Sequence, residues 1–140
     1  MIFKGAPYPI RQDPMGYFRT QTSIDQIKSD LLILLLTTPG SRCMLPNFGT
    51  PLKQLIFEPN DAALANRARD MIIESIRKWE PRIVVEEIEV SSSIDVDSLS
   101  NDDPRENIDN ILSIRILFYD PENIKMVQEL KLDIPLSGVG

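Results

Sequence analysis

The spacing of apolar residues changes at one point of this chain, the segment KWEPRI at positions 78–83. Before this segment, apolar residues recur at helical spacing, which predicts an amphipathic helix over residues 61–79. After it, apolar and polar residues alternate, which is typical of strands with one buried face. Pro81 lies at the change and predicts the end of the helix, because the residue before a proline is disfavoured in the helical conformation. The apolar stripe of the predicted helix comprises Leu64, Ala68, Met71, Ile72, Ser75, Ile76 and Trp79, and its opposite face carries Arg67, Arg69, Glu74 and Lys78.

Three strands are predicted beyond this junction, at residues 82–90, 111–119 and 124–134. The first changes its alternation at Glu86 and Glu87, which indicates a β-bulge. The segment DPEN between the last two strands has its proline in a position that favours a turn. We therefore expect an antiparallel meander with one face against helices. Residues 91–107 are polar and acidic, and we expect an exposed loop there.

A second helix is expected in the first half of the chain, within TSIDQIKSDLLILLL. Ser23 and Gln26 have the spacing of a capping box. Thr50 followed by Pro51 predicts the cap and first turn of a short helix that ends near Ile56. Residues 1–21 are rich in proline and aromatic residues and predict an irregular N-terminal arm, followed by a single domain over residues 22–140. The expected fold class is α+β, with two main helices packed on a three-stranded antiparallel β-meander.

The composition excludes several kinds of chemistry. The chain has no histidine, which excludes Ser-His-Asp and Cys-His catalysis and histidine-ligated metals. Cys43 is the single cysteine, and such a residue is more often a small buried group than a nucleophile. The net charge of −6 disfavours nucleic-acid binding. No apolar run is long enough for a bilayer and the first residues lack the layout of a signal peptide, so we expect a cytoplasmic protein without membrane contact.

Two acidic clusters admit a ligand or an enzymatic interpretation. Asp95 and Asp97 begin like a calcium-binding EF-hand loop, but Leu99 and Ser100 stand where a ligand and a glycine belong, so a solvated loop is favoured. A second cluster could supply the acid and the base of a glycoside hydrolase. Glu87 and Glu89 of this second cluster share a strand face that we expect to face water. The second cluster comprises Glu80, Glu86, Glu87 and Glu89.

Three stretches together resemble one protein family. The family's pattern of a leucine-rich helix end, Thr-x-x-Gly-x-Arg, Pro-x-Phe-Gly, then Leu and Phe is found in LLTTPGSRCMLPNFGTPLKQLIFEP. Its Glu-Pro-Arg signature is found in WEPRI. Its aromatic lead-in is similar to YPIRQDPMGYF. The family is the small baseplate wedge protein, or sheath initiator, of contractile phage tails, which is also found in type VI secretion baseplates and is often labelled lysozyme-like. The resemblance covers residue 8 to the end. One departure is Ser41, which replaces the acidic residue of the family's Gly-Glu-Arg.

The resemblance implies a structural protein of the virion, assembled in the host cytoplasm, with no reaction and no cofactor. It implies three classes of partner: the tail sheath protein, wedge core proteins and tube-proximal proteins. Glu80, Pro81 and Arg82 would contact the wedge core, with Arg42 as a further partner-binding residue. The last strand would offer its open edge to sheath subunits, because unpaired backbone groups at a sheet edge bind an added strand. The residues expected on this sheath-facing strand are Lys125, Glu129, Lys131 and Asp133.

Three alternatives remain at this point. Glu80 and Arg82 could form only a local surface ion pair at a helix stop, worth about 0–1 kcal/mol. The chain could be a lysozyme-like enzyme that cleaves peptidoglycan and loses this activity on Glu80→Gln. It could also be a regulatory binding protein, since a stress-response anti-adaptor shares the fold. Against these, the structural interpretation predicts that Arg82→Ala leaves the isolated fold largely intact and gives tails without sheath.

Overall fold

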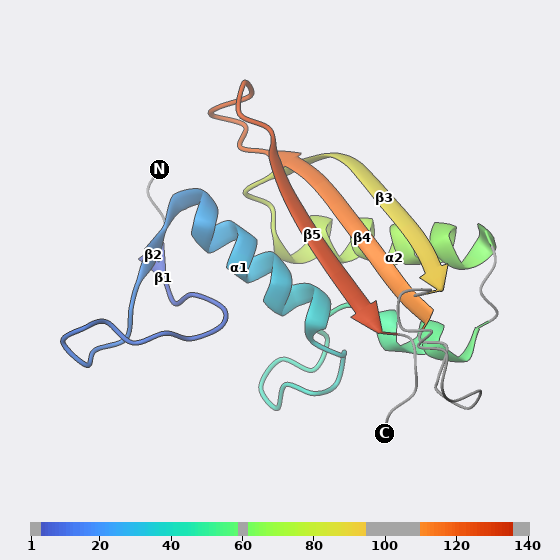
Figure 1. The fold of residues 1–140 in the computed structure, drawn as a ribbon, viewed down its shortest axis with the longest axis horizontal. Coiled ribbons are helices and arrows are strands. Elements are labelled where there is room, and N and C mark those ends of the chain that lie inside the picture. The colour runs from blue at the N-terminus through green and yellow to red at the C-terminus, as the bar shows by residue number, and fades with distance from the viewer. Residues whose placement is uncertain (1–3, 59–61, 95–109, 136–140) are drawn as a thin grey trace, which may run out of the picture.

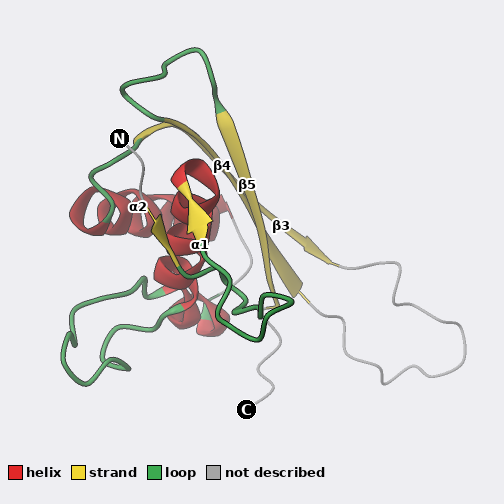
Figure 2. Ribbon diagram, turned by 90° about the vertical axis from the view of Figure 1, so that its left-hand side faces the viewer, coloured by secondary structure: helices red, strands yellow, loops and turns green. Residues whose placement is uncertain are grey.

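The protein consists of a three-stranded sheet covered on one face by two helices, with a small two-stranded ribbon at its N-terminal side (Figures 1 and 2). This computed structural model describes residues 4–58, 62–94 and 110–135. The helices are α1 (Ser23–Leu36) and α2 (Ala62–Trp79), and a short 3-10 helix, η1 (Leu52–Phe57), lies between them. The α+β class and the arrangement of two main helices on one sheet are confirmed.

The sheet is an antiparallel meander in the order β3-β4-β5. Its strands are β3 (Val84–Ile94), β4 (Asn110–Tyr119) and β5 (Gln128–Pro135). The register of β3 against β4 shifts between Val85 and Glu87, so the predicted bulge is confirmed. Because β4 is central, β3 and β5 are the two edges of the sheet.

The core lies between this sheet and the helices. Leu112, Ile114, Ile116 and Phe118 alternate along β4 and are all buried, as their spacing predicts. They meet the buried stripe of α2 and the apolar face of α1. The buried residues from the helices include Ile27, Leu31, Leu34, Leu35, Leu64, Ala68, Ile72 and Ile76. The outer face of the sheet is bare in the described parts of the molecule (Figure 2).

The N-terminal arm is more regular than expected. β1 (Lys4–Gly5) pairs antiparallel with β2 (Gln21–Thr22), which closes the arm into a loop whose two ends are joined. This ribbon continues directly into α1, so the arm projects from the N-terminal end of that helix and away from the sheet (Figure 1). Pairing of its two ends fixes the base of a segment that composition alone described as irregular.

Two predicted helix caps are wrong. Thr22 occupies the N-cap position of α1 and makes no side-chain cap, while Ser23 has a φ of 54°. The capping box fails because Thr22 belongs to the β1–β2 ribbon, and the Gln26 side chain turns to Asp30 instead. Thr50 does not cap η1 either, since its hydroxyl donates to the carbonyl oxygen of Leu34 at 3.2 Å.

Three further expectations need correction. β3 runs to Ile94, so residues 91–94 belong to the strand and not to the polar loop, whose remainder, with Asp95 and Asp97, lies outside the described residues. β5 begins at Gln128, and residues 124–127 lie in the connection before it, outside the strand. Cys43 is exposed, so it is not a buried apolar group. No helix in the described ranges has the length and apolarity needed to cross a membrane.

Candidate functional site

The Glu80–Pro81–Arg82 segment, called the joint below, forms a closed ion pair. The backbone N–H of Glu80 still donates to the carbonyl of Ile76 at 2.8 Å, so the helical hydrogen bonds run up to the residue before Pro81. Arg82 then turns back, and its Nε and Nη2 donate to Oε1 and Oε2 of Glu80 at 2.5 and 2.6 Å. Two parallel bonds between a guanidinium and a carboxylate fix both side chains in one geometry.

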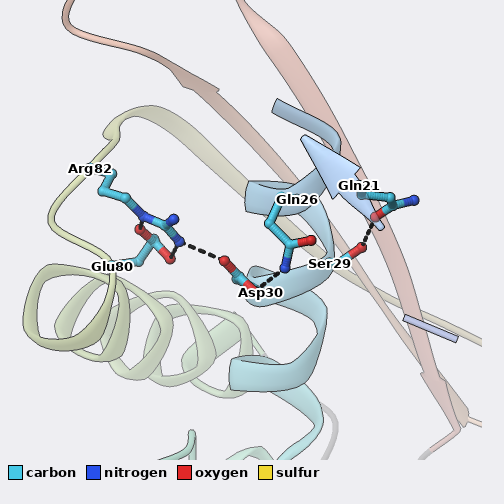
Figure 3. A network of polar contacts seen from close by, with 6 residues as sticks. All are labelled: Gln21, Gln26, Ser29, Asp30, Glu80 and Arg82. Atoms are coloured by element: carbon cyan, nitrogen blue, oxygen red, sulfur yellow. Dashed lines mark hydrogen bonds and ion pairs between the residues drawn. The ribbon is translucent and has the colours of Figure 1, made fainter. Parts of the chain in front are cut away.

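The joint is tied to α1 by a third residue. Arg82 Nη2 also donates to Oδ2 of Asp30 at 2.6 Å, across 52 positions of sequence (Figure 3). The Glu80 side chain is 7% exposed, against 27% for Arg82 and 29% for Asp30. The hydrogen bonds that Arg82 donates to Glu80, and then to Asp30, raise the pKa of Arg82 despite its partial burial, so the guanidinium stays charged. The contact with Asp30 and the burial of Glu80 show that this ion pair is more than a local pair at the surface.

A second set of contacts links Asp30 to the base of the arm. Gln26 Nε2 donates to Asp30 Oδ1 at 2.8 Å, and Ser29 Oγ donates to Gln21 Oε1 at the same distance (Figure 3). Gly5 lies directly on the Gln26 amide, and a Cβ at this position would lie 2.5 Å from the Gln26 side chain. The buried Gln26 Oε1 accepts no hydrogen bond from the described residues. The arm and the joint thus pack on one face of α1.

The loop after α1 reaches the same region from the other side. The guanidinium of Arg42 lies 4.7 Å from the centre of the Phe48 ring, and this ring meets Trp79 edge-on at 5.2 Å. A pocket of about 200 Å³ lies between this aromatic pair and the joint. Arg42 is itself exposed. The loop motif and the Glu-Pro-Arg motif, separate in sequence, therefore form one surface. The residues that line the pocket are Asp30, Ile33, Leu34, Phe48, Trp79 and Glu80.

Three of the four charged residues expected on the last strand lie on the bare face of the sheet. Glu129, Lys131 and Asp133 are exposed on β5, whereas Lys125 lies in the turn before it, so its placement on the strand is wrong. Arg115 of β4 connects the two edges, because it donates to Glu89 Oε2 at 3.0 Å and also bonds to Glu129. The hydrogen bond from Arg115 lowers the pKa of Glu129. These ion pairs stabilise strand register on a solvated face.

The four glutamates of the second acidic cluster lie in different surroundings. Both oxygens of Glu80 accept hydrogen bonds from Arg82. Glu86, Glu87 and Glu89 are exposed along β3. Among the residues that the structure describes, no group of acidic or cysteine side chains is placed to hold a metal ion.

Asp30 and Phe48 are the contributors to this surface that the sequence did not identify. Asp30 immediately precedes the leucine-rich run of α1, and an acidic residue beside such a run is a weak signal. Phe48 belongs to the Pro-x-Phe-Gly motif, but only the fold brings its ring to Trp79.

Comparison with known proteins gives concordant matches. Residues 21–118 match the family described as baseplate wedge protein gp25. Baseplate protein W of Escherichia phage P2 is 29% identical over 76 residues, which are 54% of this chain and 66% of that protein, slightly less than two thirds of its length.

Two solved structures share the fold. A candidate tail lysozyme of Geobacter sulfurreducens has a TM-score of 0.64 at 23% identity, over 82% of this chain and 92% of the other. A chain in the baseplate of the anti-feeding prophage has a TM-score of 0.61 at 18% identity, over 97% and 87%. At these identities the likeness concerns the fold alone.

Proposed function

Because the chain belongs to the baseplate wedge protein gp25 family and is thus a structural component of a contractile tail baseplate, we propose that it anchors to the wedge and nucleates the tail sheath. Tail sheath protein, wedge core proteins and tube-proximal proteins are the proposed partners. The observation that carries the proposal is the open edge of β5. In the described residues β5 pairs with β4 on one side and with no strand on the other.

An open edge strand presents unpaired N–H and C=O groups, which a second chain can complete by adding a strand. β5 is suited to this because its eight residues alternate regularly between the exposed and the inner face. Exposed Glu129, Lys131 and Asp133 would then set the register of an incoming strand through opposite charges. Lys125 lies outside the strand, and we propose that it contacts sheath from the turn.

The wedge contact is proposed on the α1 side of the joint, where Arg42, Phe48 and Asp30 lie. The ion pairs of Arg82 hold this surface together, since they join α1 to the segment that follows α2. Pro81 and Arg42 are exposed beside it and can meet a partner directly. Glu80 and Arg82 would act mainly by holding this surface in shape, because their charges already bond to each other.

A pair of proline variants tests the edge. Neighbouring residues of an edge strand direct their backbone N–H groups to opposite sides. Of the two variants Lys131→Pro and Leu132→Pro, one therefore removes a backbone hydrogen bond to β4, and the other removes an N–H donor on the open edge. Each is compared with alanine at its position. We expect one proline variant to lose thermal stability, and the other to match its alanine control in melting temperature yet give tails without sheath. Fully sheathed tails from the stable proline variant would reject the role of β5.

A further inference from the structure

The N-terminal arm carries a concentration of exposed apolar side chains. Residues 11–19 form a small hairpin, with Arg19 N–H donating to the Arg11 carbonyl at 2.9 Å and Asp13 N–H donating to the Tyr17 carbonyl at 2.7 Å. We call residues 8–19 the aromatic hairpin. Its side chains are far from buried: Tyr17 is 74% exposed and Phe18 75%. Exposed apolar clusters of this kind mark interaction sites. The exposed apolar residues are Tyr8, Ile10, Met15, Tyr17 and Phe18.

A groove with matching properties lies elsewhere on the same chain, between the end of α2 and the free edge of β3. Its volume is about 470 Å³, and its lining is mainly apolar. Val84 on this edge is 40% exposed. The apolar lining consists of Ile73, Ile76, Pro81, Ile83, Val84, Val85 and Ile88.

The charges around the two surfaces are complementary. The hairpin carries Arg11 and Arg19 with a single carboxylate, Asp13, in its turn. The groove has the opposite balance of charge, with two exposed carboxylates, Glu86 and Glu87, and one cation, Arg77. Its fourth charged residue, Glu80, is already paired with Arg82. Complementary charges at the rim of an apolar contact steer association and exclude wrong partners.

The hairpin does not fill the groove of its own chain. It projects from the N-terminal end of α1 away from the sheet, whereas the groove lies between α2 and β3 (Figure 1). We propose that the aromatic hairpin of one copy binds the α2–β3 groove of a second copy. The two surfaces differ, so the contact is head-to-tail and joins copies into a ring or a row. It uses the β3 side of the joint and leaves the α1 side, proposed above for the wedge, accessible.

A complementation experiment with the purified chain tests this contact without sheath or wedge, so its outcome is separate from that of the proposed function. One variant, Tyr17→Ser/Phe18→Ser, removes the hairpin contact and keeps the groove. The other, Glu86→Arg/Glu87→Arg, reverses the rim of the groove and keeps the hairpin. All four residues are exposed, so both variants are expected to fold. Ile124→Ser/Met126→Ser is the matched control, because these apolar residues are exposed in a different turn.

In sedimentation velocity, we expect the wild type and the control to associate as concentration rises, and each variant alone to stay monomeric. An equimolar mixture of the two variants should form a heterodimer and nothing larger, since it contains one intact hairpin–groove pair. Copies held on one assembly experience an effective concentration of about 1 mM. A wild type that stays monomeric up to this concentration would overturn the proposal. Association of the Tyr17→Ser/Phe18→Ser variant alone, or a monomeric mixture, would overturn it as well.

Discussion

Arg82 holds two carboxylates at once, and the environments of these carboxylates differ. Glu80 is almost fully buried, while Asp30 is about three-tenths exposed. A buried carboxylate is tolerated because its partner supplies two charge-assisted hydrogen bonds. Removing the partner is costly mainly because the remaining charge is left in a poorly solvated position. The joint therefore contributes to the stability of this chain as well as to its surface.

This arrangement changes what we expect of substitutions at Arg82. Arg82→Ala should lower the free energy of unfolding by about 2 kcal/mol, because Glu80 loses both of its bonds. The double variant Glu80→Gln/Arg82→Ala should be more stable than Arg82→Ala alone, since it leaves no buried charge unpaired. Urea denaturation measures both values. Equal stability of the single and the double variant would show that the Glu80 charge costs nothing once Arg82 is removed, and Asp30→Asn, which leaves Glu80 bonded, serves as the milder comparison.

Sequence predicted part of this residue-scale picture. Glu80 and Arg82 are two positions apart beside a proline, so a mutual pair was foreseeable. Asp30 was not, because its contact with Arg82 depends on how α1 packs beside the end of α2. The capping box at Ser23 and Gln26 matched a local pattern, but the pairing of Thr22 with Lys4 took precedence over it.

At the scale of elements, the loop between α1 and η1 owes its shape to close backbone approach. Gly49 has a φ of 124°, and a Cβ there would lie 2.3 Å from the carbonyl oxygen of Thr37. The next residue, Thr50, donates its N–H to that same oxygen at 3.0 Å. This contact brings the two ends of the loop together and places Phe48 against Trp79.

Gly49→Ala should therefore destabilise the protein by at least about 2 kcal/mol, because it adds both a steric clash and a strained φ. Gly40→Ala is the matched control: its φ of 90° is also positive, but nothing lies within 4 Å of its Cβ position, and we expect a cost of roughly 1 kcal/mol. Thermal denaturation compares the two. Similar melting temperatures would show that the loop accommodates the extra carbon by moving.

The strands show which element-scale features a sequence reveals. The bulge near Glu86 and the buried side of β4 were predictable, because alternation directly reports which side chains face the core. The start of β5 was not, since Ile124 and Met126 continue the alternating pattern while exposed in turns. Apolar residues in a turn carry the same pattern as strand residues, and only pairing with β4 distinguishes them.

At the scale of the whole molecule, the sequence left open whether this protein is an enzyme. The solved relative described as a candidate tail lysozyme shares the fold, and fold alone does not establish an activity. Commitment of both Glu80 oxygens to Arg82 argues for a structural role. We expect no loss of turbidity when the purified protein is added to a peptidoglycan suspension, and the same result for Glu80→Gln. Clearing by the wild type that Glu80→Gln abolishes would instead establish a hydrolase.

The three-stranded sheet has consequences for growth of an assembly. Its central strand is satisfied on both sides, and each outer strand in the described structure leaves one row of hydrogen-bonding groups vacant. Within the described residues, this three-stranded sheet therefore offers two rows for strand addition. A copy with one row sealed would still be incorporated through the other row, but it would act as a chain terminator beyond which no further subunit could be added.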